Sequence, residues 1–148
     1  MQHEVTYSLI EHLRKEIGIN AYWIYDGVVL PDDTQKPYIT VEQLQNDNDV
    51  LSKNREAVRT IMRYQVGLFA KTASERARKQ DEIRETLMFD SIYLLDTTTN
   101  PPPVVGEIIA LVTAETPISP ENIADKSKYH RVYFDVEVPV VRNRRKQN

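Results

Sequence analysis

The sequence contains no cysteine, and only four of its 148 residues are glycine. Without cysteine the chain has no disulfide, no thiol nucleophile and no thiolate metal site, so its stability must come from packing or from assembly. Four glycines leave no glycine-rich loop that could cradle a phosphate or a nucleotide, and no nucleophile elbow. Most of the common catalytic signatures are therefore excluded by composition.

Long apolar runs are also missing, since none approaches the roughly 20 residues that a membrane-spanning helix requires. The first residues, which include Glu4 and Glu11, lack the basic start and apolar stretch of a signal peptide. We therefore expect synthesis in the cytoplasm and no membrane partner.

The residues that are present have the proportions of a folded protein. Hydrophobic residues make up 41% of the chain and charged residues of both signs 28%, with a net charge of −3. This length and composition predict one domain with one core. We assign residues 1–141 to a single α+β domain and residues 142–148 to a basic tail, which is either a solvated terminus or a contact for an acidic partner or the DNA backbone.

Two segments have the pattern of helices. Apolar residues recur every four positions from Val5 to Ile17, and Gly18 follows where a helix would end. In the second segment, Thr72 and Glu75 fit a capping box in which each side chain reaches the other residue's backbone N–H. This helix should run to about Met88, with a thin buried stripe that comprises Ala73, Ala77, Gln80, Ile83, Arg84 and Leu87.

Alternating or β-rich segments predict the strands. The clearest are residues 58–70 and 129–141, in which every second residue is apolar or small. Residues 19–25 and 38–44 are rich in β-branched and aromatic side chains. Segments 92–95 and 107–113 look strand-like, residues 45–54 read as a polar exposed loop, and Ser119 could start a helical turn. The expected fold is α+β, with a mostly antiparallel sheet of about four or more strands flanked by two main helices.

A search for chemistry gives no catalytic, cofactor or metal site. His3, His12 and His130 lie far apart, and none has a second ligand at helical spacing. The segment Asp47-Asn48-Asp49 lacks the glycine and closing glutamate of a calcium loop. Asp32 and Glu42 have the separation of a nuclease metal pair, but Leu44 stands where a lysine would be needed. We therefore expect a protein that is not an enzyme and needs no cofactor.

The last predicted strand carries an unusual outer face. Tyr129, Arg131 and Tyr133 share this face, and tyrosine and arginine are enriched where proteins bury contacts with partners. Ile61 and Phe69 likewise interrupt the polar face of residues 58–70. These five residues are our candidates for a subunit interface, and the alternative is an ordinary solvated face.

The order of elements and several short segments resemble the tail terminator, or tail completion, proteins of long-tailed bacteriophages. The similar segments are Leu13-Arg14-Lys15, Ala21-Tyr22-Trp23, Lys36-Pro37-Tyr38-Ile39-Thr40-Val41-Glu42, Arg63-Tyr64-Gln65-Val66-Gly67-Leu68-Phe69-Ala70-Lys71-Thr72, Asp81-Glu82-Ile83-Arg84 and the strand over 129–138. They cover about three quarters of the chain, and segment 91–128 is not matched.

The resemblance implies a structural protein of the virion, located at the head-proximal end of the tail. Such a protein forms a homo-oligomeric ring, a hexamer, that caps the tail tube, ends its elongation and provides the docking surface for the head. Its partners are the tail tube protein and a head-completion or connector protein, and DNA passes through the lumen without specific binding. We assign contact with the neighbouring ring to loop residues Asp47, Asn48, Asp49, Lys53 and Arg55.

Two other functions stay open. A neighbouring head-completion or connector subunit would have the same small domain and the same ability to form rings. A small DNA-processing enzyme would require metal-dependent activity that involves Asp32 or Glu42.

Overall fold

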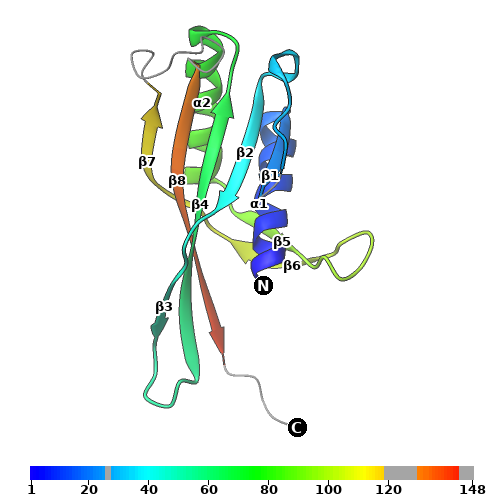
Figure 1. Cartoon of the computed structure of the whole chain (residues 1–148). Coiled ribbons are helices and arrows are strands. Elements are labelled where there is room, and N and C mark those ends of the chain that lie inside the picture. The colour runs from blue at the N-terminus through cyan, green and yellow to red at the C-terminus, as the bar shows by residue number, and fades with distance from the viewer. Residues whose placement is uncertain (26–27, 119–129, 144–148) are drawn as a thin grey trace.

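A computed structural model of the chain describes residues 1–25, 28–118 and 130–143. Within these residues it is an α+β protein with two helices and eight strands (Figure 1). In chain order the elements are α1 (Gln2–Ile17), β1 (Asn20–Ile24), the 3-10 turn η1 (Asp33–Gln35), β2 (Tyr38–Gln43), β3 (Asp47–Val50), β4 (Ala57–Phe69), α2 (Ala73–Phe89), β5 (Ile92–Leu95), β6 (Val104–Ile108), β7 (Leu111–Pro117) and β8 (Arg131–Asn143).

The main sheet is mixed but mostly antiparallel. Its strand order is β1-β2-β4-β8-β7, and β3 pairs with β4 beyond the end of β2. The pair β1–β2 is parallel, while the other pairs are antiparallel. The longest ladder joins β4 to β8 over the whole of β4, so these two strands form the spine on which the other elements are built. Strands β5 and β6 make a separate two-stranded sheet.

Both helices lie on the same face of the main sheet (Figure 1). The alternation that the sequence shows in β4 and β8 directs one set of side chains into this layer, where Tyr64, Val66 and Phe134 are fully buried. α1 contributes Val5, Leu9 and Leu13, and α2 contributes Ile83 and Leu87. Burying each such aliphatic side chain contributes roughly 1.5–3 kcal/mol, so the helix-facing side of the sheet is the core of the protein.

The expected start and end signals of the helices are present, with two corrections. Gly18 ends α1 with φ 77, and its N–H donates to the Arg14 carbonyl at 3.0 Å. Thr72 caps α2 by accepting from the Glu75 N–H at 3.1 Å, but the Glu75 carboxylate accepts from the Lys71 N–H and not from Thr72. The predicted stripe was wrong at Ala73 and Ala77, which are exposed. The N-terminal half of α2 therefore does not pack on the sheet through these two alanines.

Two strand predictions also need correction. The segment 45–54 is not only a loop, because β3 lies inside it and pairs with β4 from Asp47 to Val50. The predicted strand 107–113 is the junction of two strands in different sheets: Ile108 ends β6, and Leu111 begins β7. The predicted helical turn at Ser119, the interface candidate Tyr129 and the tail residues from 144 onward lie outside the described residues, whereas Arg142 belongs to β8.

Candidate assembly surfaces

A three-stranded arm extends the sheet beyond the body of the protein. It consists of β3, the first residues of β4 (57–61) and the last residues of β8 (139–143), and it projects away from the two helices (Figure 1). Both polar and apolar side chains are exposed on the arm. The apolar ones include Val50 and Val141, each 58% exposed. The arm therefore presents apolar surface that the described part of this chain does not cover.

The tip of the arm is held by a network around Ser52. The Leu51 N–H donates to the Ala57 carbonyl at 2.9 Å, and the Arg55 N–H donates to the Ser52 carbonyl at 3.1 Å. The Ser52 hydroxyl accepts from the N–H groups of Glu56 and Ala57. Arg55 completes the turn with φ 56, a conformation that costs a side-chain-bearing residue free energy. The tip is thus a defined hairpin turn and not a loose loop.

The five residues assigned to ring contact have two different positions in the arm. Asp47 and Asp49 pair with Arg63 and Arg59 at 2.6 and 2.7 Å, and the Asn48 side chain accepts from the Thr60 hydroxyl at 2.6 Å. These three contacts hold β3 to β4. Lys53 and Arg55 lie at the exposed tip, and neither has an ion pair with any described residue. Only the two tip residues are therefore free to contact another molecule through their charged groups.

The interface candidates Phe69, Arg131 and Tyr133 form a cluster on the helix-free face of the sheet. The Phe69 ring stacks on the Tyr38 ring at 4.8 Å between centroids and meets the Tyr133 ring edge-on at 6.2 Å. The Arg131 guanidinium lies 4.2 Å from the centre of the Phe69 ring. Phe69 is only 3% exposed. Side chains of the same chain therefore already cover its ring and leave almost none of it accessible to a neighbouring subunit.

A hollow of about 330 Å³ adjoins this cluster. Its other walls are formed by Ile24 of β1, by Tyr25, Val28 and Leu30 of the β1–β2 connection, by Thr40 and Glu42 of β2, and by Gln65 of β4. The Arg131 Nε atom is buried and has no acceptor among the described residues, although the guanidinium contacts the Tyr133 hydroxyl at 3.3 Å. This end of β8 therefore keeps an unused hydrogen-bond donor.

Ile61 is separated from that cluster. It shares the helix-free face with Phe69, but it lies eight positions earlier in β4, roughly 26 Å away along the strand. Ile61 is half-buried in the arm, between Asp47 of β3 and Pro139 of β8. The structure therefore divides the predicted interface into two surfaces, one at the body and one on the arm.

The main sheet ends in two unlike edges, β1 on one side and β7 on the other. The outer edge of β1 faces a groove of about 620 Å³ that Tyr7, Ile10 and Arg14 of α1 help to line. Arg14 occupies part of this edge by donating to the Ala21 carbonyl at 3.1 Å. Sequence reasoning did not find either edge, because strand order cannot be read from hydrophobic periodicity.

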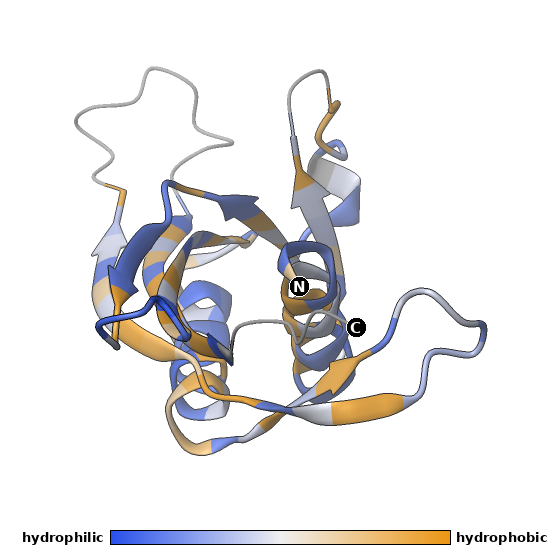
Figure 2. Ribbon diagram, turned by 90° about the horizontal axis from the view of Figure 1, so that it is seen from below, coloured by the Kyte–Doolittle hydropathy of each residue, from blue (hydrophilic) through white to orange (hydrophobic). Residues whose placement is uncertain are grey.

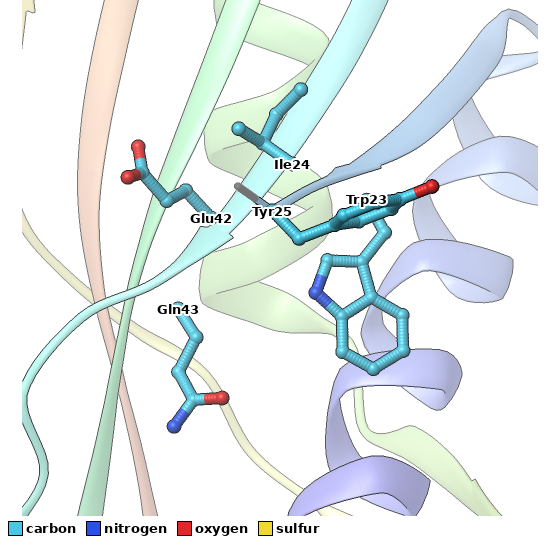
Figure 3. A pocket seen from close by; sticks show the side chains of 5 residues that line it. All are labelled: Trp23, Ile24, Tyr25, Glu42 and Gln43. Atoms are coloured by element: carbon cyan, nitrogen blue, oxygen red, sulfur yellow. The ribbon is translucent and has the colours of Figure 1, made fainter. Parts of the chain in front are cut away.

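A wider hollow of about 730 Å³ lies where the parallel strands β1 and β2 end. Figure 3 shows Ile24 and Glu42 projecting to one side of these strands and Trp23 and Gln43 to the other, with Tyr25 at the end of β1. Among the described residues its lining has one carboxylate and no cation, so these residues offer no pair of groups for acid–base chemistry.

The residues considered for catalysis or metal binding do not converge. The Asp32 carboxylate accepts from the Thr34 N–H and hydroxyl, while Glu42 is exposed on β2. His12 contacts Asp90 at 3.0 Å, and His3 contacts the Thr97 hydroxyl at 2.9 Å. Among the described residues no three His, Asp or Glu side chains gather in a way that could hold a metal ion.

No protein-family model matches this chain, and no curated protein sequence matches it significantly. Within the described ranges, neither helix has the length and apolar character needed to cross a bilayer.

Proposed function

We propose that this protein is a non-catalytic subunit of a bacteriophage tail terminator ring. The ring would cap the tail tube, end its elongation and provide the surface onto which the filled head docks. The proposal is supported by the sequence resemblance and by the exposed apolar and charged surfaces described above.

The feature that carries the proposal is the arm. Three strands leave the body and pair through their backbones, and the Asp49–Arg59 and Asp47–Arg63 ion pairs further link β3 to β4. An extension with uncovered apolar residues is a liability for a monomer, because open strand edges and apolar patches promote association. It is an advantage for a subunit that must contact neighbours.

The unlike edges of the sheet support the ring in particular. A closed ring requires a heterologous interface, in which one side of each subunit contacts a different side of the next. The β1 edge, bordered by a groove and by Arg14, differs from the β7 edge. Two sides of one subunit can therefore carry different contacts, as rotation into a closed ring demands.

Electron microscopy of virions made without this protein tests the proposal. A terminator is needed to stop tube growth, so its removal should give overlong tails without heads. Tails of normal length attached to heads would show that the protein has another role.

Co-sedimentation with purified tail tubes distinguishes the terminator from a connector on the head side. A terminator should pellet with tubes whose ends are open, and a connector should stay in the supernatant.

Replacement of Asp32 or Glu42 should change neither tube capping nor any nuclease activity of the preparation, whereas loss of a metal-dependent nuclease activity would favour an enzyme.

A further inference from the structure

A second exposed apolar surface lies at the end of the body from which the arm projects. We call it the base patch, and it consists of Met88, Phe89, Tyr93, Val105 and Ile109. Phe89, the last residue of α2, is 82% exposed. Seen from below in Figure 2, the hydrophobic colours of β6 and of the end of α2 lie at this end of the molecule.

The pairing of β5 with β6 brings the two parts of the base patch to one end of the small sheet. Ile92 pairs with Ile108, so Phe89, three residues before β5, and Ile109, directly after β6, both lie toward that end. Tyr93 and its partner Glu107 lie on the outer face of the two strands, opposite to the buried Ile92 and Ile108. Exposed apolar side chains that gather at one end of a small domain are typical of a binding site.

The charges around the base patch are acidic. Glu107 lies within it and Glu85 lies one turn before Phe89 on α2, and both are exposed. No described residue forms an ion pair with either carboxylate. The base patch therefore combines apolar side chains with uncompensated negative charge.

The arm has the complementary character. Its exposed apolar residues are Val50, Leu51 and Val141. Lys53, Arg55 and Arg142 are exposed beside them and outnumber Glu56, and none of the three cations has an ion pair within the described chain. Apolar contact with a rim of opposite charge is the usual composition of a specific protein interface.

We propose that the arm of one subunit docks on the base patch of a second copy of this chain. The two surfaces are different and belong to the same molecule, so the contact is heterologous and can be repeated around a ring. This inference rests on the proposed ring function and makes it specific: it assigns Lys53 and Arg55 to contact within one ring and not to contact with the neighbouring ring.

Cysteine cross-linking tests the contact directly, because the chain has no cysteine of its own. The double variant Leu51→Cys/Phe89→Cys places one thiol on the arm and one on the base patch. Treated with a short bifunctional maleimide at high protein concentration, it should give a ladder of dimers and larger multimers. The control Leu51→Cys/Glu16→Cys has the same number of thiols, but its second thiol lies at the C-terminal end of α1 and not on the base patch. A yield of multimers no more than twice that of this control would overturn the proposal.

Charge reversal separates failure of this contact from failure of the ring function. Lys53→Glu/Arg55→Glu should weaken self-association at least tenfold by mass photometry, and the further changes Glu85→Lys/Glu107→Lys should restore it. If the first variant forms rings as wild type does but no longer caps tail tubes, the arm contacts the tube, and the inference is wrong while the ring function stands. If wild type neither forms multimers nor caps tubes, both are wrong.

Discussion

At the residue scale, Gly67 shows how closely the helix-free face of the sheet is packed. A Cβ atom at this position would lie 2.5 Å from the Thr40 hydroxyl oxygen and 3.1 Å from the rings of Phe69 and Tyr133. Glycine is therefore required here by close approach of side chains and not by its backbone conformation. The rings of the cluster converge over the space that it leaves.

We predict that Gly67→Ala destabilises the protein by about 1–3 kcal/mol, the usual cost of overpacking. Chemical denaturation with urea measures this change. Gly106→Ala is the matched control, since its Cβ would meet only Leu94 atoms at 3.8 Å and beyond, which is ordinary contact. Equal stability of the Gly67 variant and wild type would show that the cluster can rearrange.

Tyr64 anchors the start of α1 to the middle of β4. Its fully buried hydroxyl contacts the Gln2 amide at 2.6 Å and the Thr6 hydroxyl at 2.9 Å. Burial raises the pKa of Tyr64 above its ordinary value of 10.0, and the hydrogen bonds from Thr6 and Gln2 oppose this only in part. The folded protein therefore favours the neutral phenol.

We predict that Tyr64→Phe lowers the free energy of unfolding by about 1–2 kcal/mol, because the buried Thr6 hydroxyl and the half-buried Gln2 amide each lose a hydrogen bond. Since the folded pKa is raised, the stability that Tyr64 contributes is present below pH 10 and is lost as pH rises through the folded pKa. The difference between wild type and variant should shrink above pH 10. Tyr93→Phe, at an exposed position, should show neither effect.

At the scale of elements, a side-chain link fixes α2 to the edge strand β7. The Arg84 guanidinium donates to both Glu115 carboxylate oxygens, at 2.7 and 2.9 Å, and the Gln80 amide donates to one of them at 3.0 Å. The hydrogen bonds that Arg84 donates to Glu115 lower the pKa of the Glu115 carboxyl and raise the pKa of the Arg84 guanidinium. This link compensates for the few apolar residues on α2.

We predict that Glu115→Gln lowers the urea midpoint at pH 7. The folded pKa of Glu115 is depressed, so its contribution to stability is present above the ordinary value of 4.5 and is lost as pH falls through the folded pKa. The midpoints of wild type and variant should therefore converge below pH 4.5. Glu16→Gln, at an exposed position without an ion partner in the described chain, serves as control, and the idea fails if both variants behave alike.

The elements that sequence predicted well are those whose pattern comes from their own burial. The alternation in β4 and β8 and the four-residue spacing in α1 directly reflect one buried face each. β3 was missed because Asp47, Asn48 and Asp49 have poor strand propensity, and β3 forms because β4 extends past β2 and offers it a partner. Propensity is a local property, whereas this pairing depends on the neighbouring strand.

At the scale of the whole molecule, the sequence identified the residues of the candidate surfaces better than their grouping. Phe69, Arg131 and Tyr133 do lie together, because neighbouring positions of paired strands share a face. Ile61 was grouped with them only because alternate residues of a strand point to the same face. This alternation says nothing about how far apart two residues lie along the strand. The base patch was not found, since Phe89 and Ile109 are 20 residues apart in the sequence and are brought to the same end of the small sheet only by the β5–β6 pairing.

The proposed ring would have to let the DNA duplex pass, and the net charge of this chain is compatible with that passage. Its net charge of −3 gives no general attraction for phosphates, and the exposed cations of the arm would be used in the subunit contact. We predict that binding of the assembled protein to a labelled 30-base-pair duplex, measured by fluorescence anisotropy at about 0.15 M salt, is weaker than about 10 µM, within the range of non-specific binding. Weak binding that appears at low salt should disappear as salt rises, since it would come from counterion release. Tight binding at physiological salt would contradict passage of DNA through the lumen without specific binding and would favour a DNA-processing role.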